Sequence, residues 1–171
     1  MIKICTACST SYEDDASIRH CKICEDERQF VPVSGQQWLA LSDLCATHQN
    51  KWQQHQPGLF SLQTVPAFAI NQRAFLLQTA HGNILWDCIA NLDSATETLI
   101  QALGGIDAIA ISHPHYYSTM QDWAATFNAP VYLHADDRQW IMRQSPYIQC
   151  WQGDELDIIP EVKLLRLGGH F

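Results

Sequence analysis

The chain has 171 residues, of which 47% are hydrophobic and 16% are charged, and its formal net charge is −8. This composition is typical of a globular protein and excludes intrinsic disorder. The acidic excess argues against nucleic acid and membrane surfaces as partners, because affinity for both comes chiefly from Lys and Arg. No apolar run approaches the roughly 18 residues of a membrane span, and the first residues, MIKICTACST, lack a signal-peptide core. We therefore expect a cytoplasmic protein.

Two Cys-x-x-Cys pairs, Cys5 with Cys8 and Cys21 with Cys24, lie in the polar segment 1–32. Twelve residues separate the pairs, a spacing typical of two knuckles that share one ion. A segment this short needs such a staple because it cannot build a core of its own. We predict a structural zinc ion on four thiolates. Iron in a rubredoxin-like site, a redox-active pair and ligation by His20 are weaker alternatives.

Residues 33–171 are predicted to form the main domain. Apolar residues recur at helical spacing after Ser34 and predict a helix over 35–54, ended by Pro57 and Gly58. Two strand-like runs, 66–79 and 83–90, are separated by turn residues and indicate a hairpin. Ser94 and Glu97 have the spacing of a capping box, which predicts a helix over 95–103.

The second half of this domain alternates strands and helices. Residues 106–112 form a short apolar run, as expected of a strand buried on both faces. Helices are predicted over 119–127 and 136–143, with a strand over 130–134 between them, and short strands follow from Tyr147. This alternation indicates βαβ units and an α/β fold.

His113 and His115 bracket one proline directly after the buried strand, so both imidazoles can lie on the same side of an extended segment. This geometry suits metal chelation, although two loop histidines alone are more often solvated. His134 ends the following strand, beside Asp136 and Asp137. It either faces the same mouth or is satisfied by a neighbouring polar group, and the second interpretation is favoured.

The motifs ILWDC with Asp87, a helix ending in Gly-Gly, IDAIAISHPH and LRLGGHF follow one another in this order. The order resembles the metallo-β-lactamase superfamily, in which an Asp-bearing strand precedes a helix, a strand ending in HxHxDH and a later Gly-His. The resemblance covers residues 68–171. The cysteine pairs resemble the zinc-ribbon extension of some relatives. The implied α/β fold is the front portion of an αββα sandwich preceded by a small zinc ribbon.

The resemblance also implies a site. His113, His115 and His170 match the three histidines of the family's first metal site, and Asp87 matches the aspartate that supports this site from its strand. Zinc or another divalent metal is the implied cofactor, because such a site lowers the pKa of a bound water. The implied function is metal-dependent hydrolysis of a small-molecule ester, thioester, amide or phosphoester, without a choice among them.

The sequence departs from the family pattern in two places. Tyr117 and Ser118 stand where HxHxDH has its aspartate and last histidine, so a standard two-metal centre is not expected. The family's remaining ligands lie well beyond Gly-His, so we expect the front portion of a longer protein, or a truncated gene product. Such a half-sandwich would expose apolar sheet surface, which favours a homodimer or poor solubility of the isolated chain.

Two other functions compete with hydrolysis. A catalytically silent zinc-binding interaction module is favoured by Tyr117 and Ser118. Nucleic-acid binding through the ribbon is disfavoured by the scarcity of Lys and Arg between Cys8 and Cys21.

Overall fold

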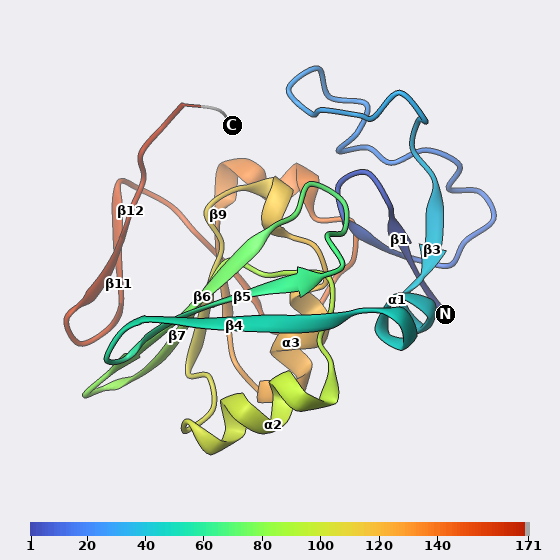
Figure 1. The fold of residues 1–171 in the computed structure, drawn as a ribbon. Helices are drawn as coiled ribbons and strands as arrows, with labels where there is room; N and C mark the ends of the chain where they lie inside the picture. Colours follow the sequence, from blue (N-terminus) through green and yellow to red (C-terminus); the bar gives the residue numbers. More distant parts are fainter. Residues whose placement is uncertain (170–171) are drawn as a thin grey trace.

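A computed structural model describes residues 1–169 (Figure 1). Within these residues the strands form a three-stranded sheet near the N-terminus, a seven-stranded mixed sheet and a separate hairpin. Helices pack against the large sheet, so the predicted α/β class is confirmed. None of the helices in this part of the chain is long and apolar enough to cross a membrane.

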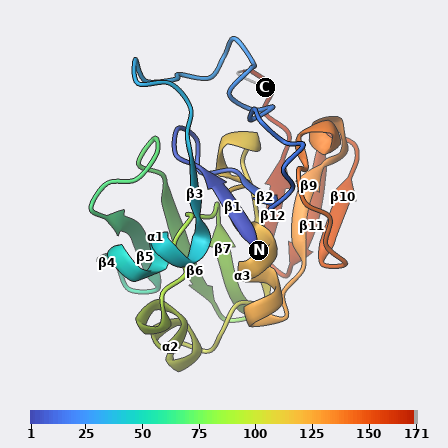
Figure 2. The ribbon, with the colours of Figure 1, turned by 90° about the vertical axis from the view of Figure 1, so that its right-hand side faces the viewer.

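The small sheet is antiparallel and has β1 (Ile2–Cys5) between β2 (Ser11–Glu13) and β3 (Trp38–Ala40). The cysteine-bearing segment therefore takes its third strand from beyond the boundary predicted at residue 32. We call residues 1–40 the N-terminal unit, which faces the viewer in Figure 2. Trp38 packs edge-on against Tyr12, with 5.1 Å between the ring centroids.

The helix predicted over 35–54 is wrong. This segment contains β3, the short helix α1 (Leu41–Thr47) and β4 (Gln49–Gln56). The strands prevail because each finds a partner: β3 pairs with β1, and β4 pairs with β5 (Leu59–Val65), a strand absent from the sequence-based prediction. In α1 only Leu44 is buried, so the apolar spacing that suggested a long helix corresponds to no continuous buried face.

The large sheet has the order β10-β9-β8-β7-β6-β5-β4. Strands β4 to β7 form an antiparallel meander, and β7 to β10 run parallel. The predicted hairpin is confirmed, with β6 shorter than the apolar run suggested. The remaining strands of this sheet are β6 (Arg73–Thr79), β7 (Gly82–Trp86), β8 (Ala108–Ala110), β9 (Val131–His134) and β10 (Ile148–Trp151).

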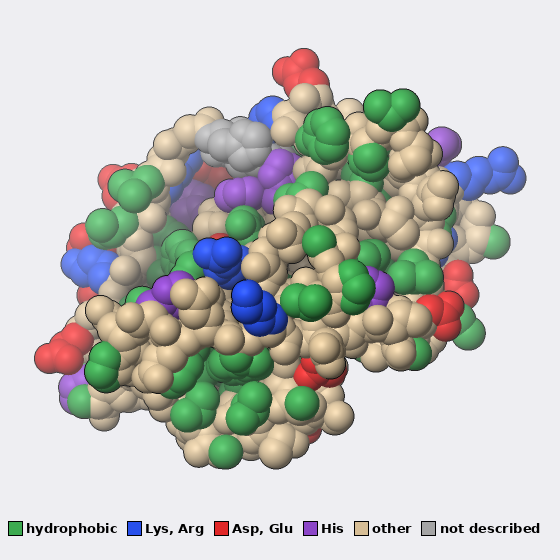
Figure 3. All heavy atoms as spheres, in the orientation of Figure 1, with side chains coloured by type: hydrophobic (Ala, Val, Ile, Leu, Met, Phe, Trp, Pro, Cys, Tyr) green, Lys and Arg blue, Asp and Glu red, His purple; other side chains and the backbone are tan. Residues whose placement is uncertain are grey.

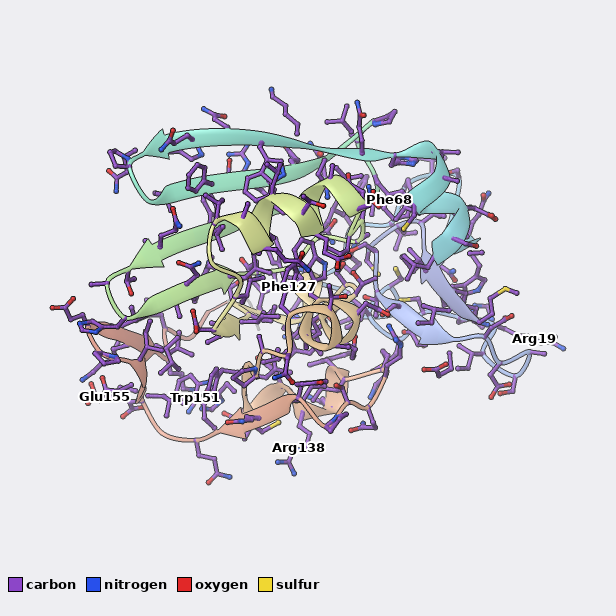
Figure 4. The ribbon with its side chains drawn as sticks, turned by 90° about the horizontal axis from the view of Figure 1, so that it is seen from below. Arg19, Phe68, Phe127, Arg138, Trp151 and Glu155 are labelled. Carbon is purple, nitrogen blue, oxygen red and sulfur yellow. The ribbon has the colours of Figure 1, made fainter. Side chains whose placement is uncertain are left out.

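Helices α2 (Ser94–Ala102) and α3 (Met120–Phe127) cover one face of the large sheet (Figure 4). Ile100, Met120 and Trp123 are completely buried there against β-strand residues such as Leu76 and Leu85. Both helices agree with the sequence prediction. Two 3₁₀ helices follow parallel strands, η1 (Pro114–Tyr116) after β8 and η2 (Ala135–Trp140) after β9.

The α-helix predicted over 136–143 is wrong, because η2 ends at Trp140. Past this point Ile141 is extended, and the guanidinium of Arg143 is buried in an ion pair with Asp122, 2.6 Å away on α3. The chain thus leaves the helical path where a buried charge pair fixes it to another element.

The opposite face of the large sheet carries the hairpin of β11 (Glu155–Ile159) and β12 (Val162–Leu165), at the left of Figure 1. Side chains alternate along a strand, so Phe75, Leu77 and Ile84 point to this face while their neighbours enter the helix-covered core. With Val162 and Leu164 they line a cavity of about 380 Å³. Trp86 remains 39% exposed. A homodimer through this surface stays a prediction.

The N-cap of α2 differs from the predicted capping box at Ser94. Asp93 is the cap: its Oδ1 accepts a hydrogen bond from the Thr96 backbone N–H at 2.7 Å. Its Oδ2 accepts one from the Asn50 N–H of β4 at 2.8 Å. One carboxylate therefore begins the helix and ties it to the sheet edge.

We expect Asp93→Ala to lower the free energy of unfolding by about 1–2 kcal/mol, because the helix loses its cap and Asn50 loses its acceptor. The control, Ser94→Ala, should change it by less than about 0.5 kcal/mol. Denaturant unfolding of both variants measures the difference. Equal losses would contradict the assignment of Asp93 as the cap.

Candidate functional site

Two tight turns bring the four predicted cysteines together. In the first, Ser9 N–H donates to the Cys5 carbonyl at 2.8 Å, and Ser9 takes a positive φ of 66°. In the second, Glu25 N–H donates to the Cys21 carbonyl at 3.1 Å. The four Sγ atoms all lie within 4.8 Å of one another, which makes these cysteines a possible metal site.

The sulfur geometry fits a tetrahedral ion. Cys5 and Cys24 have their Sγ atoms 3.4 Å apart, and Cys8 and Cys21 have theirs 3.5 Å apart. These distances are too long for disulfides, whereas Zn–S bonds of about 2.3 Å place sulfurs about 3.8 Å apart. In the part of the chain that the structure describes, this is the one group of three or more candidate ligand side chains. His20 is exposed and outside it.

The surroundings of Cys21 favour its thiolate. Hydrogen bonds from Cys24, Cys5 and Cys8 hold the pKa of Cys21 well below its ordinary value, against the effect of burial. The Tyr12 hydroxyl also donates to the Cys21 Sγ at 3.3 Å and accepts from the Lys22 N–H at 2.9 Å. Burial raises the pKa of Tyr12, so this phenol remains a donor. A metal ligand of this type must be deprotonated.

The second site begins at Asp87, the residue directly after β7. Its φ is 64°, and its side chain is turned toward the end of β8. Oδ1 accepts from the Ser112 N–H at 2.7 Å, and Oδ2 accepts from the Ser112 hydroxyl at 3.1 Å. Asp87 is 5% exposed. It therefore fixes the residue that immediately precedes His113.

His113, Pro114 and His115 form what we call the HPH segment. The two imidazole centroids are 5.0 Å apart, with the rings nearly perpendicular at 82°. His115 is buried, and His113 lines a cavity. His113 Nδ1 accepts from the His115 N–H at 3.2 Å, so a neutral His113 ring carries its proton on Nε2. Metal ligation by either nitrogen of this ring would require that hydrogen bond to be released.

Two further histidines, His170 and His134, were singled out in the sequence. His170 lies outside the described residues. His134 has both ring nitrogens engaged: Nδ1 accepts from the Asp136 N–H at 3.3 Å, and Nε2 donates to the Gly153 carbonyl at 3.2 Å. This arrangement agrees with the favoured interpretation of His134 as a satisfied strand-end histidine, although its ring also borders the cavity.

The cavity has a volume of about 580 Å³ and lies at the carboxyl ends of β8, β9 and β10. Ligands of open α/β sheets bind at this end of the parallel strands. Figure 3 shows histidine side chains gathered in a hollow in the upper part of the molecule. The lining of the cavity includes His113, Asp137, Trp140, Trp151, Arg28 and Arg166.

Sequence reasoning missed the two arginines of the cavity. Arg28 comes from the N-terminal unit and pairs with Asp26 at 2.6 Å. Arg166 follows β12 and pairs with Asp136 at 2.5 Å. A lone arginine in a polar segment carries no sequence signature, and only the packing of distant segments brings these two to one cavity.

Tyr117 and Ser118 are buried and do not line the cavity. Burial raises the pKa of Tyr117, which keeps the phenol protonated. The Ser118 carbonyl accepts from the N–H of Ser11 at 3.1 Å and from its hydroxyl at 2.6 Å. Of the two positions that depart from the family pattern, Ser118 thus lies against the N-terminal unit and Tyr117 is buried in the core.

Comparison with known proteins gives one sequence relative and several structural likenesses. No family model matches the chain. The uncharacterized protein YmaE of Bacillus subtilis (strain 168) is 45% identical over 171 residues, which cover 98% of this chain and 62% of that protein. The chain thus spans less than two thirds of the length of this curated relative.

Among solved structures, a subclass B3 metallo-β-lactamase from a soil metagenome library matches 62% of this chain and 47% of its own, at 13% identity and a TM-score of 0.48. The metallo-β-lactamase GOB-18 from Elizabethkingia meningoseptica matches 63% of this chain and 47% of its own, at 18% identity and a TM-score of 0.43. The fold resembles that of metallo-β-lactamases. At such identities function has to be argued from the residues of this chain.

We expect the double variant Cys5→Ser, Cys8→Ser to lose the metal ion of the cysteine site and to melt at a lower temperature, since the N-terminal unit has little core of its own. Cys45→Ser is the control, because Cys45 is exposed and outside the cluster. Metal content per chain and thermal unfolding measure both effects. Unchanged metal content in the double variant would rule out the four-sulfur site.

Burial raises the pKa of Asp87 to about 6 from an ordinary value of 3.8, against the hydrogen bonds from Ser112. Between about pH 4 and pH 6 the unfolded chain releases this proton before the folded chain does, so stability falls as pH rises through this window. In Asp87→Asn this pH-dependent contribution of the carboxyl group to stability is absent. We expect the stability of this variant relative to the wild type to rise by up to about 3 kcal/mol from about pH 4 to pH 7.

Urea unfolding of both proteins across this range tests the prediction of a buried carboxyl. The comparison between the two proteins cancels the contribution of thiolate protonation, which both share. A stability difference that is constant with pH would show that folding leaves the pKa of Asp87 unchanged, and one that falls as pH rises would show that folding lowers it. Either result would contradict the raised pKa.

Proposed function

We propose that the chain is a metal-dependent hydrolase of the metallo-β-lactamase type, with a structural zinc ion on its four N-terminal cysteines. The cavity at the carboxyl ends of β8 to β10 is its substrate site. One observation carries the proposal: His113 lies in the wall of this cavity, on a segment that also bears His115 and that Asp87 anchors through two hydrogen bonds to Ser112.

The donor set suits a divalent metal such as zinc, because two imidazoles from one short segment are typical zinc ligands. His113 and His115 would hold it, with His170 as the third ligand that the sequence resemblance implies. When bound, the metal supplies a water of lowered pKa and polarises the oxygen of the substrate's carbonyl or phosphoryl group. Binding requires the His113 ring to leave its hydrogen bond with the His115 N–H.

The residues of the chain supply positioning, exclusion of water and proton transfer. Asp87 orients the HPH segment, and the indoles of Trp140 and Trp151 wall the cavity. Asp137 is the carboxylate proposed to accept a proton, since Asp136 is paired with Arg166. Burial raises the pKa of Asp137, which moves this carboxyl toward the range useful for a base at neutral pH.

A catalytically silent interaction module with zinc on its cysteines is the second candidate. The hydrogen bond on His113 Nδ1 favours it, because this nitrogen is already used within the chain. The burial of Tyr117 and Ser118 also favours it, since neither side chain reaches the cavity.

Metal stoichiometry distinguishes the two candidates. The hydrolase should bind two zinc ions per chain, one lost in Cys5→Ser, Cys8→Ser and the other in His113→Ala, His115→Ala. The silent module should bind one, unaffected by the histidine changes. His81→Ala is the control, because His81 is an exposed histidine away from the cavity.

Hydrolysis of model esters, thioesters, amides and phosphodiesters tests the activity itself. We expect the histidine variant to lose at least about 100-fold in rate with its circular dichroism unchanged, because removal of a ligand should cost at least as much as the roughly 10–100-fold loss typical of residues that only support a ligand. A single zinc ion per chain, together with equal rates for the wild type and the histidine variant, would reject the hydrolase.

A further inference from the structure

The side-chain amide of Gln72 joins the two candidate metal sites. Gln72 is 6% exposed, and its Nε2 lies 2.8 Å from the Cys8 carbonyl, 2.7 Å from the Ser9 hydroxyl and 2.9 Å from the His115 carbonyl. Cys8 belongs to the cysteine cluster and His115 to the HPH segment. One nitrogen therefore contacts a knuckle of the first site and the backbone of the second.

Gln72 is held from the side of the large sheet. It directly precedes β6, and the preceding turn is closed by the Asn71 N–H, which donates to the Phe68 carbonyl at 2.8 Å. The side chain of Gln63 on β5 donates to the Asn71 carbonyl at 3.1 Å. The Gln72 amide thus extends from an anchored turn into the gap between the N-terminal unit and the HPH segment.

The Gln72 amide has fewer hydrogens than acceptors, so its hydrogen bond to His115 depends on where the Cys8 knuckle lies. A carboxamide NH₂ has two hydrogens, and here it faces three oxygen acceptors. Two of these oxygens, on Cys8 and Ser9, belong to the knuckle and move with it. When the knuckle shifts, the hydrogen bond between the Gln72 amide and the His115 carbonyl becomes stronger or weaker.

The loop that begins at His115 ends at Ser118, and this end also contacts the N-terminal unit. Ser11 donates to the Ser118 carbonyl through both its N–H and its hydroxyl, and Arg143 Nη1 donates to the Ser11 hydroxyl at 3.1 Å. The loop from His115 to Ser118 is therefore fixed to the N-terminal unit at both ends. Gln72 provides the end that adjoins the histidines.

We propose that Gln72 is a positioning residue that couples the geometry of the cysteine-bound metal to the position of the HPH segment. A change at the four sulfurs moves the Cys8 knuckle, and the amide of Gln72 transmits this movement to His115. The coupling itself is independent of hydrolysis. Its consequence for the histidine site rests on the proposed function.

Replacement of one metal by another tests the coupling without removing the ion that holds the N-terminal unit. The full chain is prepared with Zn²⁺ or with the larger, thiol-preferring Cd²⁺, and backbone amide signals are compared by NMR. In the wild type we expect the exchange to shift the His115 and Tyr116 amide signals. In Gln72→Ala we expect these shifts to be lost, with the same metal content.

Gln78→Ala is the matched control, because Gln78 Nε2 donates to a backbone carbonyl, that of Leu103 at 2.9 Å, in another part of the sheet. It should retain the wild-type response. Gln72→Glu, which keeps the length of the side chain but removes its donors, should behave like Gln72→Ala.

Three results would overturn the coupling: His115 signals in the wild type that do not respond to the exchange, a response that persists in the Gln72 variants, or failure of the cysteines to bind either ion. If the Gln72 variants do not fold, the side-chain NH₂ signals of Gln72 in the wild type take their place: they should shift together with the His115 amide on metal exchange, and a His115 shift without a Gln72 shift would overturn the coupling. Absence of hydrolysis or of a second metal would reject the proposed function and leave this response intact, so the two failures are distinguishable.

Discussion

The convergence of four sulfurs at the N-terminus is the constraint on which the rest of the arrangement depends. Three of these cysteines are buried, and the fourth is half-buried, within a unit of three short strands. Most of the buried apolar side chains of this unit belong to the same hydrophobic cluster as the core of the large sheet. Because the unit has little apolar surface of its own, we expect metal ligation to add to the stability that this packing provides. Strand β2 contacts the loop after β8 directly, through Ser11 and Ser118, and the Cys8 knuckle reaches it through Gln72. The N-terminal unit therefore takes part in holding that loop.

The N-terminal unit contributes Arg28 to the lining of the cavity and packs onto the segment that carries Trp140. Lys22, next to Cys21, donates to the Gln139 carbonyl at 2.8 Å and lies over the Trp140 ring. Arg28 lies over the same ring and lines the cavity. A ligand in this cavity would therefore contact both the segment stapled by the cysteines and the carboxyl ends of the parallel strands.

The features predictable from sequence are those encoded locally. The cysteine spacing, the β6–β7 turn and the apolar faces of α2 and α3 are each specified within a few residues. The edge strand β4, QNKWQQHQ, has no alternating apolar pattern, and its strand conformation comes from pairing with β5. The roles of Gln72 and Arg28 were not predictable. Gln72 acts through contacts with residues at least 43 positions away in the sequence. Arg28 reaches the cavity only because the whole N-terminal unit docks beside it.

Positions 117 and 118, where the sequence departs from the family pattern, are also affected by the packing of the N-terminal unit against the domain. The pattern that the sequence resembles has metal-binding Asp and His there, whose side chains must reach a polar site. Here the Tyr117 ring is buried, and the Ser118 backbone accepts two hydrogen bonds from Ser11. A loop packed in this way cannot present carboxylate and imidazole to a second ion in the cavity. Ser118 instead joins the domain to the unit that carries the four cysteines, and Tyr117 packs into the core.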